Sequence, residues 1–143
     1  MPDRLLDRKH RGDFRSKWAL VARASSGFGV QFANLLAERK ANLVLVARRV
    51  ERMEKMRAEL QRAHPVQVLV EGMDLSRTGA AAEIKSRLDA RGIPIDILVN
   101  NAGYGIYGPF LQQPLEKITE MLRLNMVAVT ELTHTFGRDM ARR

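Results

Sequence analysis

The sequence predicts a doubly wound α/β domain, in which a parallel sheet carries helices on both faces. Two observations predict this fold: four short apolar runs alternate with longer amphipathic segments, and a glycine-containing turn joins the first run to the segment after it. The 143 residues, 45% of them hydrophobic, suffice for one sizeable core. We expect a flexible, basic extension at residues 1–16 and the domain at residues 17–143.

The first half of the domain contains two predicted strands and two predicted helices. Residues 18–21 and 42–47 are apolar runs typical of buried strands. The helix between them spans about residues 27–39. Its apolar side is expected to contain Phe28, Phe32, Leu35 and Leu36. A second helix, which ends near His64 and Pro65, is indicated by the helical spacing of Met53, Met56 and Leu60.

The second half of the domain continues the alternation. Residues 66–70 predict the third strand and residues 95–100 the fourth. A third helix at residues 80–90 has its apolar side on Ala81, Ile84 and Leu88, and Gly92 follows it as a left-handed cap. A long helix begins at about Pro114, a favourable first-turn residue, and continues toward residue 138.

This last helix has two apolar stripes. One contains Leu115, Ile118, Leu122, Val129 and Phe136, and the other contains Met121, Leu124, Ala128 and Thr135. One stripe can pack on the sheet, so the second predicts contact with another subunit and hence a homo-oligomer. The alternative is a helix end with modest additional burial.

Composition excludes several classes of site. The sequence has no cysteine and only three scattered histidines, so we expect neither disulfides nor a metal site. No apolar run approaches the ~20 residues that a membrane span needs, and the basic N-terminus lacks the apolar block of a secretory signal. We therefore expect a cytoplasmic protein without a membrane partner. The net charge of +8 is compatible with nucleic acid, anionic lipid or a phosphorylated ligand, but no nucleic-acid-binding motif is recognisable.

The turn after the first strand, ARASSGFG at residues 22–29, is suited to a phosphate. Gly27 and Gly29 lack a Cβ, which allows the backbone to approach a pyrophosphate at the positive end of the following helix. Ser25 and Ser26 add hydroxyl donors. The position of this turn, after the first strand and before the first helix, strengthens the prediction of a dinucleotide site.

Two further residues follow predicted strands at the same edge of the sheet. Arg48 lies about twenty positions beyond the glycine turn, where a carboxylate would bind the ribose hydroxyls of NAD; an arginine suits the 2′-phosphate of NADP instead. The alternative is a solvated arginine at a helix start. Asp74, after the third strand, either accepts a hydrogen bond from an adenine amino group or caps its own turn.

Four segments together resemble the short-chain dehydrogenase/reductase family, of the NADP-preferring bacterial type. They are ASSGFG after the first strand, Asp74-Leu75 after the third, LVNNAG at residues 98–103 and LRLNMVAVTELT around Asn125. The resemblance covers about residues 17–138. It implies a Rossmann-like fold with strand order 3-2-1-4-5-6-7, here truncated after about four strands.

The resemblance also implies roles for individual residues. The pyrophosphate would be bordered by Ser25, Gly27, Phe28 and Gly29, the 2′-phosphate by Arg48, and the adenine by Asp74 and Leu75. Asn101, Ala102 and Gly103 would lie near the ribose, and Asn125 would be the catalytic-site residue that anchors a water-linked proton relay. The implied cofactor is NADP(H) in preference to NAD(H), and the implied substrate is a small carbonyl compound or alcohol.

The sequence departs from the family pattern in two places. Ala22 and Arg23 stand where the TGxxxGxG turn has Thr and its first Gly, and we expect Arg23 to weaken cofactor binding. The catalytic Ser and Tyr-x-x-x-Lys of the family are absent, since neither Tyr104 nor Tyr107 has a lysine four positions later. We therefore expect a cofactor-binding half that is inactive alone; the alternative is a degenerate interaction module that pairs with a full-length relative.

Overall fold

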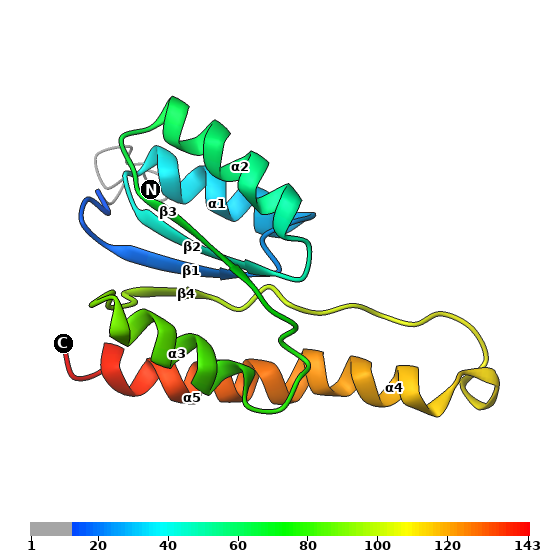
Figure 1. Ribbon diagram of the computed structural model, residues 1–143. Coiled ribbons are helices and arrows are strands. Elements are labelled where there is room, and N and C mark those ends of the chain that lie inside the picture. The colour runs from blue at the N-terminus through cyan, green and yellow to red at the C-terminus, as the bar shows by residue number, and fades with distance from the viewer. Residues whose placement is uncertain (1–12) are drawn as a thin grey trace, which may run out of the picture.

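The computed structural model describes residues 13–143, which form one sheet between two layers of helices (Figure 1). The strands are β1 (Trp18–Ala22), β2 (Asn42–Ala47), β3 (Val68–Gly72) and β4 (Ile97–Val99). Helices α1 (Phe28–Glu38) and α2 (Val50–Ala63) lie on one face. The other face carries α3 (Ala80–Ala90) and α5 (Ala128–Met140), and α4 (Leu115–Leu122) lies in line with α5 beyond the strand ends.

All strand pairs are parallel, and the strand order is β3-β2-β1-β4. Leu20 of β1 lies opposite Val44 of β2 and Leu98 of β4. The doubly wound fold and the first four positions of the expected strand order are confirmed. Because parallel strands share one direction, the turns after β1, β2, β3 and β4 meet at one edge of the sheet.

The core has two apolar layers, one on each face of the sheet. Successive residues of β1 and β2 contribute to opposite layers. Val21 and Leu45 point toward α1 and α2, whereas Leu20 and Val44 point toward α3 and α5. All four are fully buried. A strand buried on both faces reads as a continuous apolar run, which explains why these strands could be located from the sequence.

The predicted element bounds need small corrections. β3 begins two residues later than predicted. The Val66 N–H donates to the His64 carbonyl at 2.9 Å, in the turn around Pro65, so Val66 is not yet part of the strand. β4 is confined to residues 97–99 of the predicted 95–100. Helix α3 agrees with the prediction at both ends, and Gly92 has the expected left-handed conformation, with φ of +66°.

The apolar side predicted for α1 is right for Leu36, which lies in the core, and wrong for the other three residues. Gly29, Ala33, Leu36 and Ala37 are the buried residues of this helix. Phe28, Phe32 and Leu35 are 77%, 42% and 48% exposed. Small residues on the inner side allow α1 to approach β1 and β2 closely, so its large apolar residues face away from the sheet.

The long last helix is interrupted by a π-helical segment, Arg123–Val127, between α4 and α5. A π segment inserts an extra residue and rotates the helix face, so stripes drawn through both halves cannot remain on one side. The core contacts are made by Leu124, Ala128, Leu132 and Phe136. The predicted division into stripes is therefore wrong: Leu115 and Leu122 are exposed, while Leu124 and Ala128 of the supposed outer stripe face the core.

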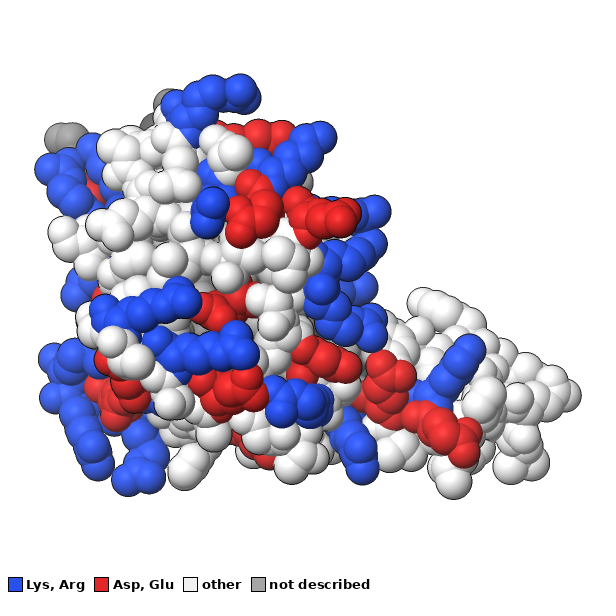
Figure 2. Space-filling view, in the orientation of Figure 1, with Lys and Arg blue, Asp and Glu red and all other residues white. Residues whose placement is uncertain are grey.

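Helix α4 and the loop before it project beyond the sheet (Figure 1). The loop includes a short 3-10 helix, Phe110–Gln112. Figure 2 shows few charged side chains on this projection. Its exposed apolar residues are Tyr107, Phe110, Leu111 and Leu115.

The predicted N-terminal extension lies outside the described residues except for its last four. Within these, the Phe14 N–H donates to the Arg39 carbonyl at 2.9 Å, and the Arg39 guanidinium lies 5.9 Å from the Phe14 ring centre. Phe14 thus packs against the end of α1. Across residues 13–143, none of the helices combines the length and the apolar character that crossing a bilayer requires.

Candidate functional site

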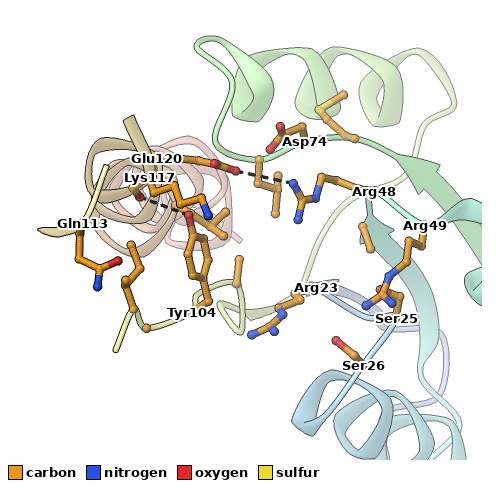
Figure 3. Close-up of a pocket in the computed structure, with 17 residues that line it drawn as sticks. Arg23, Ser25, Ser26, Arg48, Arg49, Asp74, Tyr104, Gln113, Lys117 and Glu120 are labelled. Carbon is orange, nitrogen blue, oxygen red and sulfur yellow. Dashed lines mark hydrogen bonds and ion pairs between the residues drawn. The ribbon is translucent and has the colours of Figure 1, made fainter. Parts of the chain in front are cut away.

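A cavity of about 530 Å³ lies at the carboxyl ends of the strands (Figure 3). Its floor contains the ends of β1, β2 and β3, and α4 with the loop before it forms the opposite wall. The charged residues that line it are Arg23, Arg48, Arg49, Lys117, Asp74 and Glu120. With four cations and two carboxylates, the cavity is suited to an anionic ligand, and its volume is in the usual range for small-molecule sites.

The backbone is closely packed where the β1–α1 turn enters α1, and no side chain fits at Gly29, the second residue of that helix. A Cβ on Gly29 would overlap the Arg23 carbonyl oxygen and lie 2.9 Å from the Asn101 Nδ2 atom. Gly27 has φ of +57° and open space around it. Ser25 and Ser26 line the cavity at the start of this turn, and Ser25 is only 8% exposed.

Arg23 occupies an unusual position in this turn. Its φ of +53° is a left-handed conformation that side chains rarely adopt, which explains why glycine is the family residue here. Its guanidinium donates a hydrogen bond to the Gly103 carbonyl, beyond the end of β4. The side chain therefore crosses from the β1 turn to the β4 loop.

Three asparagines tie the β4 end to its surroundings. The Asn101 amide donates to the Ala22 carbonyl at 3.3 Å, which links β4 to β1. The Asn100 amide donates to the Thr133 hydroxyl at 2.8 Å. The Asn125 side chain, in the π segment, accepts from the Tyr104 N–H at 3.0 Å and donates to the Tyr104 carbonyl at 2.8 Å. Asn125 thus holds the loop that follows LVNNAG.

Arg48 and Asp74 lie on the cavity wall formed by β2 and β3. Arg48 forms an ion pair of 3.6 Å with Glu120 of α4 (Figure 3). Asp74 accepts hydrogen bonds from the Ser76 N–H at 3.0 Å and from its hydroxyl at 2.7 Å. Burial raises the pKa of Asp74, but the Ser76 hydrogen bonds and the charges of Arg48 and Arg77 outweigh it and lower that pKa overall.

Tyr104 reaches into the cavity, and its hydroxyl donates to the Lys117 carbonyl at 3.4 Å (Figure 3). Burial raises the pKa of Tyr104, and the nearby Glu120 carboxylate raises it further. A tyrosine that exchanges protons near neutral pH needs the opposite shift. Tyr104 is therefore a wall residue, in agreement with the lack of a lysine four positions later.

The cavity brings together about half of the residues predicted from the sequence. Those that line it are Ser25, Ser26, Arg48, Asp74, Leu75 and Ala102. Gly27, Phe28, Gly29, Asn101, Gly103 and Asn125 lie outside its lining. Arg49, Tyr104, Lys117 and Glu120 also line the cavity, although the sequence pattern did not predict them there. The three-residue spacing of Lys117 and Glu120 on one helix face was the available signal.

This fold and this cavity define a Rossmann-like α/β protein with a cationic cavity at the carboxyl edge of its sheet. Residues 17–143 match the family model described as short chain dehydrogenase. The chain belongs to the short-chain dehydrogenase family.

Individual relatives agree with this assignment. A very-long-chain 3-oxoacyl-CoA reductase from Scheffersomyces stipitis is 33% identical over 133 residues, which cover 91% of this chain and 38% of that protein. Among solved structures, the bulky-bulky ketone specific alcohol dehydrogenase from Comamonas testosteroni has a TM-score of 0.81 with 36% identity, covering 88% of this chain and 50% of that one. A short-chain dehydrogenase from Sphingobium yanoikuyae in complex with NADPH has a TM-score of 0.80 with 37% identity, at 88% and 49% coverage. The chain spans about two fifths to one half of the length of these relatives.

Proposed function

We propose that this chain is the NADP(H)-binding part of an oxidoreductase that transfers hydride between NADP(H) and a small carbonyl compound or alcohol. The observation that carries the proposal is Arg48, which lines a cationic cavity at the carboxyl edge of the sheet. A guanidinium at this place recognises the 2′-phosphate that distinguishes NADP from NAD.

The residues present fit the phosphorylated adenosine part of the cofactor. Leu75 and Ala47 offer apolar surface for a base, and the Asp74 carboxylate can accept from its amino group. The Ser25 and Ser26 hydroxyls and the start of α1 would hold phosphate oxygens. The nicotinamide ring, when bound, supplies the hydride chemistry. Asn125 would anchor the proton relay, and its position in a π segment supports a functional role because such segments are frequent at functional sites.

Comparison of NADPH with NADH by isothermal titration calorimetry tests the proposal. We expect the wild type to prefer NADPH, and Arg48→Ala to lower NADPH affinity about tenfold, as expected for one charged hydrogen bond, with little change for NADH. Arg52→Ala, an exposed arginine of α2 outside the cavity, is the matched control. Glu120→Gln should raise NADPH affinity, because it frees Arg48 from its ion pair. Equal affinity for the two cofactors would refute the NADP preference.

We also propose that the last helix mediates self-association, through a surface that combines Leu122 of the first predicted stripe with Met126 and Val127, which belong to neither stripe. Leu122, Met126 and Val127 are 46%, 62% and 49% exposed, an apolar surface on the α4 and π segments. Leu122→Lys with Met126→Lys should therefore weaken association in sedimentation velocity experiments by about tenfold or more. Arg138→Ala, at an exposed position near the far end of α5, should not. A wild type that is monomeric at all concentrations would contradict this proposal.

A further inference from the structure

Resting on the proposed function, we propose that Glu120 of α4 supplies the ribose-binding carboxylate that the sequence lacks at the end of β2. This carboxylate accepts a hydrogen bond from the adenosine 2′-hydroxyl of NAD(H), whereas Arg48 beside it binds the 2′-phosphate of NADP(H). The cavity then has a recognition group for each cofactor, and Glu120 determines how strongly NADPH is preferred over NADH.

The Glu120 carboxylate lies beside the residue that recognises the 2′ position of the adenosine. Its Oε1 atom is 3.6 Å from Nη1 of Arg48, and the two side chains point toward each other from α4 and from the end of β2 (Figure 3). A phosphate oxygen bound to the same nitrogen at about 2.8 Å would therefore lie within about 6.5 Å of the Glu120 oxygen. The 2′ substituent of an adenosine held at Arg48 thus has both side chains in its immediate surroundings.

The charge of Glu120 favours a hydroxyl over a phosphate at this place. An ionised carboxylate has acceptors only, so a ribose hydroxyl can donate to it and a fully ionised phosphate cannot. A phosphate monoester carries a charge of about −1.5 to −2 at neutral pH, so the carboxylate also repels it. Glu120 therefore has opposite effects on the binding of NADH and NADPH.

Of the two carboxylates that line the cavity, Asp74 and Glu120, the second is the one available to a ribose. The Asp74 Oδ1 atom accepts two hydrogen bonds from Ser76, within the turn after β3. Within residues 13–143, Glu120 has one ion pair, in which Arg48 contacts Oε1. The Oε2 atom can accept from a hydroxyl while this ion pair persists, so NADH can bind without breaking it.

The loop after β4 fixes the part of α4 that carries Glu120. The Tyr104 hydroxyl donates to the Lys117 carbonyl at 3.4 Å, three residues before Glu120. Asn125, in the π segment that follows α4, contacts the Tyr104 N–H at 3.0 Å and the Tyr104 carbonyl at 2.8 Å. The helix is thus held on both sides of Glu120, which keeps the carboxylate at the cavity.

Calorimetric titration of the 143-residue protein with NADH and with its 2′-deoxyadenosine analogue tests the inference, since the analogue lacks only the hydroxyl in question. We expect the wild type to bind the analogue about tenfold more weakly than NADH, as for one hydrogen bond to a charged group. In Glu120→Ala, the affinity for NADH should fall to that for the analogue, which itself should not change. Glu116→Ala removes an exposed carboxylate of the same helix outside the cavity and should keep the wild-type difference.

The same substitution in an Arg48→Ala background separates a direct contact from release of Arg48. No ion pair is left to break there, so Glu120→Ala should still weaken NADH binding about tenfold. It should strengthen NADPH binding, because it removes the repulsion of the 2′-phosphate. If Glu120→Ala left the NADH affinity unchanged in both backgrounds, Glu120 would act only through Arg48, and the inference would be overturned.

The outcomes separate this inference from the proposed function. A wild type that binds NADH and its 2′-deoxy analogue equally would overturn the inference even if a Glu120 variant did not fold, and it would leave the preference for NADPH untouched. Unchanged NADPH affinity in Arg48→Ala would instead count against the proposed function, while the loss of NADH affinity in Glu120→Ala would still support the inference. If none of the three compounds bound to the wild type, both would fail.

Discussion

The two edges of the sheet, β3 and β4, are built differently. β3 has five residues and carries an inward-pointing charge: Glu71 is 3% exposed and lies 2.9 Å from Arg87 and 3.2 Å from Arg91, both near the end of α3. β4 has three residues, Ile97, Leu98 and Val99, all apolar and all partly exposed. In the described part of the chain, β4 pairs only with β1.

The difference shows which edge strand has a feature that prevents pairing with a further strand. A charge that points inward on an edge strand prevents further strand pairing, because pairing would have to accommodate it. Glu71 has that role on β3, while β4 presents only apolar residues and open backbone groups. The exposed Phe28, Phe32 and Leu35 of α1 are further apolar surface that the described residues leave uncovered. The solved relatives, about twice as long as the matched segment, have additional chain available for such surfaces.

Of the changes that test this comparison, removal of the arginine partners of Glu71 should have the largest effect on stability. Arg87→Met together with Arg91→Met leaves a buried carboxylate without a countercharge, which should lower the free energy of unfolding by about 3–5 kcal/mol. The measurement is urea denaturation followed by circular dichroism. Arg57→Met, which breaks the exposed pair with Glu54, is the control and should cost less than about 1 kcal/mol.

A third variant makes this prediction specific to the charge. When Glu71→Leu is added to the two arginine substitutions, most of the lost stability should return, because an apolar residue of similar volume replaces the unpaired carboxylate. If the double arginine variant were as stable as the wild type, Glu71 would not depend on its partners for burial.

The fold could be predicted well because its determinants are local in the sequence. Strands buried on both faces appear as apolar runs, and β2 and α3 have the predicted bounds. The errors arose where a determinant is not local. The π segment at residues 123–127 changes the phase of the last helix, and no periodicity in the sequence indicates it. The inner side of α1 depends on how closely the helix approaches the sheet, which composition does not reveal.

The site was predictable only in part, for the same reason. Residues that directly follow strands, such as Arg48 and Asp74, lie at the expected edge of the sheet. Glu120 and Lys117 reach the same cavity from a helix more than forty positions later in the chain than Asp74, and their contribution depends on tertiary packing. The contact of Arg23 with Gly103 spans eighty positions. The sequence showed that Arg23 is unusual, but not where its side chain ends.

Exchange of the charge pattern between the two edges should have an intermediate effect. Val99→Lys places a charge on β4 and should weaken self-association of the 143-residue protein about tenfold, while Glu71→Leu removes the charge from β3 and should strengthen it. Sedimentation velocity over a range of concentrations measures both. Neither substitution touches the helix surface at Leu122 and Met126. If Val99→Lys had no effect and Glu71→Leu promoted no association, edge protection would not explain the difference between β3 and β4.

Lowering the pH should have the smallest of these effects, a local loss of stability after β3, where Asp74 lies. The Ser76 hydrogen bonds lower the pKa of Asp74, after β3, below its ordinary value of 3.8, despite the opposing effect of burial. A carboxyl group with a lowered pKa in the folded state stabilises the fold fully above its ordinary pKa, and this contribution is lost as the pH falls through the lower, folded value. The protection factors of the amides around residues 72–76, which compare the observed exchange rate with the intrinsic rate at the same pH, should therefore fall below about pH 4. In Asp74→Asn this loss of protection should disappear, since an amide does not titrate in this range. A variant that retained the full acid response would assign it to other carboxylates, such as Glu83, whose pKa is lowered by its hydrogen bond from Arg77.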